Sequence, residues 1–556
     1  MKSKCVRTVA TWLKFQSFDM GECSGVLRNL GDDDVFNRRL EHEFHACGWH
    51  GVLNLWQGFV PILQFIFAIL VDALLSYCPT LVISSICYTI GLGMLSLSTP
   101  AMTGSCKEYK AECIGLPQKI LFYIALANIA VGISGQTVAL VPFFQYQHER
   151  WLSRYRSEET AYECAVGSSI LIGILTGIFL PLIGKERWSI SFGLPAILYL
   201  LATILFLFVV RLDLYYPMTP EGSPFIKVVR VIAASVYKIF LKHPDDPTRL
   251  YEDSNKNHKI PHTPGLRFLD KAAISSGPDA YSWSICTVTE VEETKTTIRI
   301  IPLAMTFIIC GLVSAIGNTY FVEQANHMNR KVGKLKVPLF FLLIIHEISK
   351  LIFNGLHSLF TYCMDKAGKK KYAPQIGMSL AMVFSILCCV IAAKVEIRRL
   401  NVIRIHGLLD KPKDTIPMSM FWLVPQFFLL AGLSSFLEQS VTVFFKDQIP
   451  PSLIKYDIYF ANGVLGLGTM ASVFSVHLSG KVSENGGKTG WFQDTLNKSR
   501  LDKYYWVLAA LSAANLLLYV FVASFYPYKE AAEDEDYDEE DDPQNRIVLP
   551  LGMPVI

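Results

Sequence analysis

The main pattern along the chain is a series of long apolar runs separated by short polar connections. The hydrocarbon core of a bilayer, about 30 Å thick, needs roughly 20 apolar residues for each helical span. About eleven such runs occur, near 53–74, 80–98, 118–145, 164–184, 189–211, 298–324, 337–364, 374–397, 417–445, 452–480 and 503–526. The pattern therefore predicts an all-α membrane protein with about eleven transmembrane helices.

A long polar connection divides the predicted spans into two unequal groups, with about five before it and about six after it. We expect a polar N-terminal segment (1–52), a bundle of five spans (53–211), a central connection (212–297), a bundle of six spans (298–526) and an acidic tail (527–556).

Basic residues in the short connections indicate the orientation, since cytoplasmic connections carry an excess of Lys and Arg. Arg150, Arg154 and Arg156 follow one span, and a lysine cluster occupies 366–371. Both segments are predicted to face the cytoplasm, as is the central connection. The basic segment 394–413 falls on the opposite side and does not obey the rule. The two termini are then expected on opposite sides of the membrane.

One part of the central connection has helical periodicity. Residues 224–242 place apolar side chains on one face, with lysine and arginine beside them. Two interpretations remain open: a helix lying along the membrane surface, or an amphipathic helix packed on its own cytoplasmic connections. Residues 245–262 read as a flexible linker, and the acidic run at 530–542 as a solvated tail.

Composition supports a multi-pass membrane protein, for which the expected location is the plasma membrane or the vacuolar membrane. Apolar residues make up 51% of the chain and charged residues 18%, and the mean hydropathy is +0.34. The net charge is +3, and the basic residues form no stripe, so a nucleic-acid partner is not expected. The 13 cysteines have no metal-ligand spacing, and no catalytic residues are grouped. We therefore expect no cofactor, no metal and no enzymatic activity. Residues 1–52 hold no apolar run typical of a cleaved signal peptide.

Ionisable residues inside a predicted span are costly and usually face the interior of a bundle, which makes them site candidates. His346, Glu347 and Lys350 lie near one face of the span at 337–364. They either line a solute pathway or form a static ion pair within one helix. Glu438 stands alone in another span, and it either lines a water-filled pore or is neutral at rest.

Other polar residues within the spans are also ambiguous. Gln136 and Thr137 follow Gly132 and Gly135, and such small residues permit close helix packing in lipid. Both side chains could instead donate hydrogen bonds to a solute, as could Asn318. In a connection predicted to lie outside, Cys106 and Cys113 form either a disulfide or two free thiols. The sequon at Asn497 is a possible glycosylation site in another outer connection.

Several motifs together carry a resemblance to a known family. The pair LRFLDKAAI (266–274) and CTVTEVEETK (286–295) resembles the central-loop signature of plant nitrate/peptide transporters. Further agreement comes from WQG (56–58), LVDA (70–73), FGLPA (192–196), EGSP (221–224), MSMFWLVPQF (418–427), FFKDQIP (444–450) and GWFQDTLNKSRLDKYYW (490–506). The resemblance implies a major-facilitator fold, in which two bundles rock about a central site and move nitrate, peptides or other small solutes with protons.

The chain departs from this family where protons are handled. We expect the family's first helix, which bears an ExxER cluster, to be missing, because the polar residues 41–45 lead directly into the family's second helix and no ExxER cluster occurs on the predicted spans. A basic residue of the family aligns with Thr137, and an acidic one aligns with Val443. The DxxxGR motif keeps Asp72 but has Ser76 and Tyr77 in place of its Gly and Arg. We therefore expect a transporter with weakened or lost proton coupling. The alternative is a membrane protein that binds or regulates without transporting, or an inactive truncated paralogue.

Overall fold

The computed structural model describes a helical protein. The described residues are 48–98, 116–152, 188–212, 215–220, 222–241, 250–251, 262–274, 282–412, 414–484, 490–493 and 495–528. The predicted span at 164–184 lies outside them.

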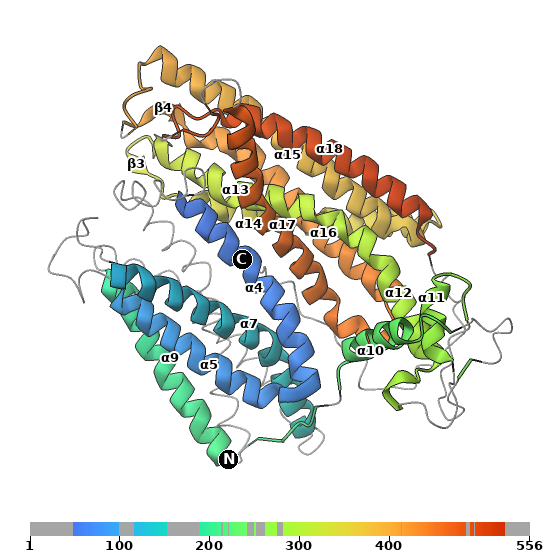
Figure 1. Ribbon diagram of the computed structural model, residues 1–556. Coiled ribbons are helices and arrows are strands. Elements are labelled where there is room, and N and C mark those ends of the chain that lie inside the picture. Colours follow the sequence, from blue (N-terminus) through green and yellow to red (C-terminus); the bar gives the residue numbers. More distant parts are fainter. Residues whose placement is uncertain are drawn as a thin grey trace.

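A first group of helices, here called the N-terminal group, packs around its own apolar core. It comprises α4 (Gly48–Leu70) with the π-turn η1 (Val71–Leu75), α5 (Tyr77–Leu97), α7 (Leu116–Leu152) and α9 (Trp188–Arg211). Leu81, Tyr88, Ile129 and Phe143 are buried at its centre. These helices lie together on one side of the molecule (Figure 1).

The second group, here called the C-terminal group, is larger. It comprises α12 (Val288–Met305), α13 (Phe307–His327), α14 (Phe340–Lys366), α15 (Ala373–Ile405), α16 (Val424–Gln448), α17 (Asp457–Ser483) and α18 (Leu501–Phe525). Its core includes Phe307, Met378, Phe427 and Tyr504 and is separate from that of the N-terminal group. A smaller cluster around Val71, Val138 and Tyr456 joins the two.

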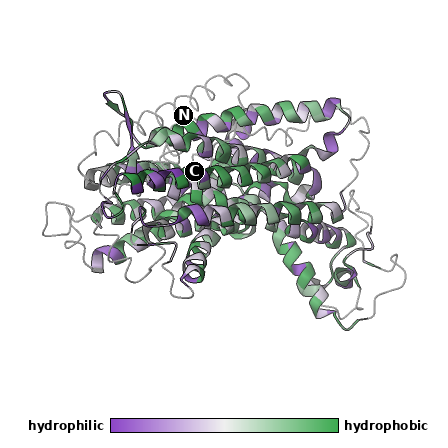
Figure 2. Ribbon diagram, turned by 90° about the horizontal axis from the view of Figure 1, so that it is seen from above, coloured by the Kyte–Doolittle hydropathy of each residue, from purple (hydrophilic) through white to green (hydrophobic). Residues whose placement is uncertain are grey.

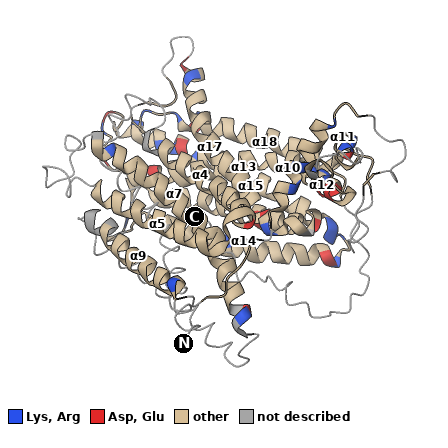
Figure 3. Cartoon of the chain, turned by 60° about the horizontal axis from the view of Figure 1, so that its bottom comes forward, with Lys and Arg blue, Asp and Glu red and all other residues tan. Residues whose placement is uncertain are grey.

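The apolar helices confirm the predicted class of fold. Within the described ranges, eight helices are long and apolar enough to cross a membrane, and α12 with α13, bent by 43°, can form a ninth. The 27-residue α14 is not among the eight. Figure 2 shows that apolar residues predominate along the helices, whereas charged residues gather at helix ends and around α11 and α12 (Figure 3).

Short strands and helices connect the longer helices of the C-terminal group and occur in the central connection. Strand β1 (Met328–Asn329) pairs in parallel with β4 (Ile416–Ser419), and β2 (Lys331–Val332) forms a hairpin with β3 (Leu335–Lys336). Gly333 forms the turn of this hairpin with a φ of +61°, a left-handed conformation that residues with a Cβ atom rarely adopt. The short helices are α11 (Arg267–Asp270), η4 (Lys271–Ala273), η5 (Ser282–Ser284), η6 (Lys370–Tyr372), η7 (Met420–Leu423) and η8 (Pro451–Tyr456).

Helices α4 and α17 run antiparallel and form a seam between the two groups. A Cβ atom on Gly58 would come within 2.5 Å of the Gly466 carbonyl oxygen, so glycine is required for this approach. Asn54 Nδ2 donates to Ser472 Oγ at 3.0 Å on the same seam. The groups are therefore in direct contact along these two helices.

The central connection contains α10 (Pro224–Tyr237), which ends before the predicted limit of residue 242. Its inner face places Val231 and Ala234 in an apolar cluster with Ala272, Val288 and neighbouring residues. Arg230 bonds to Glu290 of α12 at 2.6 Å. The inner face of α10 therefore packs on the central connection, as the second of the two interpretations expected.

Candidate functional site

An ion pair joins two helices of the C-terminal group within the predicted spans. Lys350 Nζ of α14 lies 2.8 Å from Glu438 Oε2 of α16. The Lys350 side chain is 15% exposed and the Glu438 side chain 31% exposed. Glu438 is therefore not isolated, as the sequence suggested, but balanced by a cation on the neighbouring helix.

The predicted pair within α14 is replaced by this contact. Glu347 Oε1 instead lies 3.0 Å from His346 Nδ1, and the Glu347 side chain is 40% exposed. Helical spacing places Glu347 and Lys350 near one face, but it does not choose between a partner on the same helix and one on the helix packed beside it. The structure brings His346, Glu347, Lys350 and Glu438 into one region.

Local packing explains why α14 and α16 approach closely enough for this pair. The Phe353 ring of α14 would lie 3.0 Å from a Cβ atom on Gly432 of α16. Ser435 Oγ donates to Asn354 Oδ1 at 2.5 Å, and His357 Nε2 lies 3.0 Å from Ser440 Oγ. Apolar and polar contacts thus hold these helices in register around the charged residues.

Gln136 and Thr137 of α7 make contacts within the N-terminal group. Gln136 is buried and donates from Nε2 to the Tyr199 hydroxyl of α9. The Thr137 hydroxyl donates to the Ile133 carbonyl oxygen at 2.9 Å. A Cβ atom on Gly132 would come within 2.6 Å of Tyr88 on α5. The geometry therefore favours the packing interpretation of this segment, most clearly for Gln136.

Asn318 lies half-buried on α13. The neighbouring Thr319 hydroxyl donates to the Ala315 carbonyl oxygen at 2.8 Å and is used within its own helix. The predicted disulfide residues Cys106 and Cys113 lie outside the described residues.

Asp72 is a contact point that sequence reasoning noted without finding its partners. Its Oδ2 atom lies 2.8 Å from Lys455 Nζ and accepts a hydrogen bond from the Tyr456 hydroxyl, both from η8. Its carbonyl oxygen accepts from the Gly222 amide at 3.0 Å, and Ser223 Oγ lies 3.3 Å from the Tyr456 hydroxyl. We call these five residues the Asp72 node. It joins the N-terminal group, the C-terminal group and the central connection.

A second network was missed because its partners are scattered along the chain. Arg399 and Glu396 of α15 are both fully buried and form a two-pronged ion pair, with both nitrogen–oxygen distances 2.7 Å. Gln324 Nε2 of α13 donates to Glu396 Oε2 at 2.6 Å, and Asn497 Oδ1 lies 3.3 Å from Arg399. The only sequence signal is a Glu and an Arg three residues apart in an apolar helix.

The sequon residue Asn497 belongs to the same network. This residue is 2% exposed, and its Nδ2 atom donates to the Leu408 carbonyl oxygen at 3.1 Å. A glycan would be attached to that nitrogen. In this fold that nitrogen is engaged in a hydrogen bond, and the sequon residue supports the buried ion pair.

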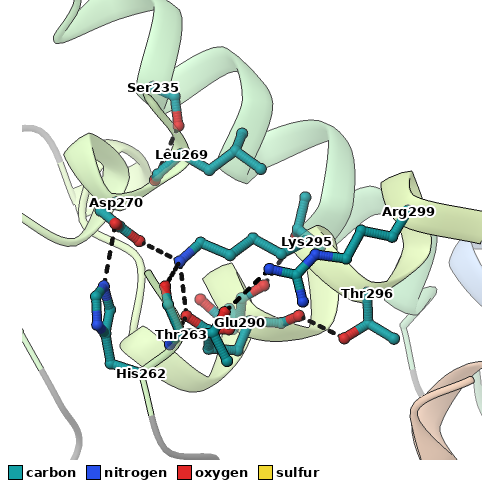
Figure 4. A network of polar contacts seen from close by, with 11 residues as sticks. Ser235, His262, Thr263, Leu269, Asp270, Glu290, Lys295, Thr296 and Arg299 are labelled. Atoms are coloured by element: carbon teal, nitrogen blue, oxygen red, sulfur yellow. Dashed lines mark hydrogen bonds and ion pairs between the residues drawn. The ribbon is translucent and has the colours of Figure 1, made fainter. Parts of the chain in front are cut away.

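Motif residues of the central connection gather around one buried ammonium group (Figure 4). Lys295 Nζ lies 2.7 Å from Asp270 Oδ1 and 2.7 Å from Glu292 Oε1, and donates to the Thr263 carbonyl oxygen at 2.9 Å. His262 Nε2 lies 3.0 Å from Asp270 Oδ2. His262, Asp270 and Glu292 have the grouping of metal ligands, but the ammonium group already serves as their cation. The cluster therefore anchors the connection to α12.

Comparison with known proteins is consistent with this geometry. The model of the POT family (PTR2) matches residues 78–492. Protein NRT1/PTR FAMILY 5.5 of Arabidopsis thaliana is 35% identical over 492 residues, covering 85% of this chain and 89% of that protein. Protein NRT1/PTR FAMILY 8.3 of the same plant is 33% identical over 506 residues, covering 86% and 85%.

Solved structures share the fold. An auto-inhibited POT family peptide transporter superposes with a TM-score of 0.63 at 14% identity, covering 96% of this chain and 98% of that one. The POT family transporter PepTSo gives a TM-score of 0.60 at 14% identity, covering 94% and 98%. Together with the matched family model and the plant relatives, these likenesses place the chain in the POT family, as a membrane transporter of the NRT1/PTR type.

Proposed function

We propose that this protein moves a small solute across its membrane by alternating access, with the two groups of helices rocking against each other. The observation that carries the proposal is the separation of the two apolar cores. They are joined by the smaller Val71–Val138–Tyr456 cluster, the glycine seam and the Asp72 node. A polar node can open and close without disrupting either core, which is what a gate requires.

We place the solute site beside Lys350 and Glu438. An ammonium and a carboxylate group in contact can each exchange their partner for a solute group of opposite charge, so an anion or a zwitterion suits the pair. His346, Glu347 and Asn318 are further candidates for contact. Nitrate, a short peptide or another small metabolite is the proposed class. The structure of a POT family transporter has been solved in complex with 5-aminolevulinic acid, which is a zwitterion. That structure superposes on this chain with a TM-score of 0.53.

Proton coupling is proposed to be weak or absent. The hydroxyl of Thr137, which aligns with a basic residue of the family, is occupied by the Ile133 carbonyl oxygen. Val443, which aligns with an acidic residue, carries no ionisable group. Among the described residues, His346, Glu347 and Glu438 are titratable and lie near Lys350, which makes them the candidates for any residual coupling.

Counterflow into proteoliposomes tests transport without needing a proton gradient. Vesicles preloaded with unlabelled nitrate, dialanine or 5-aminolevulinic acid should accumulate the matching labelled solute when the purified full chain is present. The control is Gly58→Leu, because a side chain at this position collides with the Gly466 backbone and should obstruct the seam. Accumulation with the wild-type protein and its loss in the control would support a carrier.

The rival is a protein that binds or regulates without transporting. It predicts no counterflow of any of these solutes although the wild-type protein is monodisperse. Binding detected by isothermal calorimetry in the absence of counterflow would favour this rival over the carrier.

A further inference from the structure

Helix α10 has a second face that the protein leaves uncovered. Whereas Val231 and Ala234 pack inward, large apolar side chains of the opposite face are exposed, and Phe240, just after the helix, is 97% exposed. The remaining members of this outer face are Ile226, Val229, Ile232, Val236 and Tyr237. A continuous apolar face on a short helix marks an interaction surface.

The position of α10 points to the bilayer as its partner. Phe225, at its start, lies with its ring 5.1 Å from the Phe65 ring of α4 and 5.0 Å from the Tyr456 ring of η8. Phe225 also packs against the cluster around Val71 and Tyr456, so α10 begins near the η1 end of the α4–η1 segment. The helix thus begins alongside the spans, and it lies across their ends (Figure 1).

Its chemistry also fits a lipid headgroup layer. Tyr237 and Trp283 of η5 are both exposed and in contact, with ring centroids 5.6 Å apart, and such amphipathic rings concentrate at membrane interfaces. The sequence of α10 contains no acidic residue, and Lys227 is exposed on it. Lys238 is instead turned inward and donates to the Ala272 and Ile274 carbonyl oxygens.

We propose that α10 lies in the headgroup layer of the leaflet on the side of the central connection, with its outer face against the acyl chains. The inner face connects α10 to the two groups of helices, because Arg230 forms an ion pair with Glu290 of α12 and Phe225 contacts Tyr456 of the Asp72 node. The helix then anchors the central connection at a fixed depth beside the moving groups.

Photo-crosslinking in a defined bilayer tests the proposal. Benzoylphenylalanine replaces Val229 or Val236 in the full chain, which is placed in nanodiscs of phosphatidylcholine and phosphatidylglycerol. These apolar positions are exposed, so the probe leaves the inner face intact. The matched control carries the probe at Lys411, which is exposed in the connection between α15 and β4. After illumination, mass spectrometry should find lipid adducts at Val229 and Val236 at least tenfold above the control.

Two results would overturn the proposal. Adducts from Val229 and Val236 to another segment of this chain, or to a second copy, would show that protein covers the outer face. Lipid adducts no more frequent than at Lys411, in protein that elutes as one species, would place the helix in water.

Discussion

Lys350 of α14 is paired with Glu438 of α16 at 2.8 Å, although Glu347 lies only one turn away on its own helix. The contact joins two helices of the C-terminal group that are far apart in sequence. A solute that exchanges with either side chain would therefore be held by one of the two groups proposed to rock against each other.

The first prediction concerns the stability of this pair. Glu438→Gln leaves the Lys350 ammonium without its counter-charge and should lower the free energy of unfolding by about 1 to 3 kcal/mol, since both groups are partly exposed. Combining it with Lys350→Met should restore most of the loss. Thermal unfolding in detergent and membrane abundance measure both effects. If the pair also binds solute, the double variant should be abundant but transport less.

Glu347→Gln is the matched control for that prediction. Because Glu347 contacts His346 and is 40% exposed, its neutralisation should change stability by less than the Glu438 substitution does. A larger loss of stability for Glu347→Gln than for Glu438→Gln, rescued by Lys350→Met, would show that Lys350 pairs with Glu347 within α14.

The second prediction concerns the Asp72 node. Asp72→Asn keeps the shape but removes the charge facing Lys455, whose side chain is 40% exposed. Losing about 1 kcal/mol from the state in which the node is closed should shift the population about fivefold towards the open state. The half-saturating concentration of solute added on the side that stays accessible while the node is closed should rise, by at most that factor, in sidedness-resolved counterflow. Tyr456→Phe should act in the same direction. An unchanged half-saturating concentration in both variants would show that the Asp72 node is not a gate.

The third prediction concerns the buried Glu396–Arg399 pair. Arg399→Met would leave a fully buried carboxylate group uncompensated and should destabilise the protein by about 3 to 5 kcal/mol. Its neighbour Arg398 is exposed and stacks 3.9 Å from the Trp422 ring, so Arg398→Met should cost less than about 1 kcal/mol. Unfolding midpoints compare the two, and equal losses would contradict the assigned network.

The fourth prediction concerns thiol reactivity in the central connection. Burial raises the pKa of the Cys286 thiol, and the nearby Arg230 guanidinium offsets this only in part. A raised pKa leaves less thiolate near pH 7, and thiolate is the nucleophile. Cys286 should therefore resist N-ethylmaleimide, whereas Cys363, which is exposed, should react. Peptide mass spectrometry reads both sites, and Cys286 should become reactive in urea.

The fifth prediction concerns the pH dependence of transport. If Thr137 has replaced a coupling cation, solute uptake should vary less than about twofold between pH 5.5 and 7.5, with no accompanying proton influx. A pH-sensitive dye inside the proteoliposomes measures that influx. Steep acid stimulation with proton influx would contradict this, and its loss in Glu347→Gln or Glu438→Gln would identify the replacement group.

The sequence by itself determined the class of protein. Span length follows from bilayer thickness, so an apolar run near 503–526 predicts a helix wherever it packs, and α18 occupies Leu501–Phe525. The central-loop motifs likewise pointed to the POT family before any contact was known. Both signals are local, because each is contained within one short stretch of chain.

Only the tertiary structure decided the partners of the polar residues. Spacing on one helix placed Lys350 near Glu347, yet the carboxylate group in contact with Lys350 belongs to Glu438, 88 positions further along the chain. Gln136 and Asn497 were candidates for a solute and a glycan, but their donors meet Tyr199 and Leu408. A buried polar group takes whichever partner the neighbouring helix presents at hydrogen-bonding distance, and that choice is set by how the helices pack.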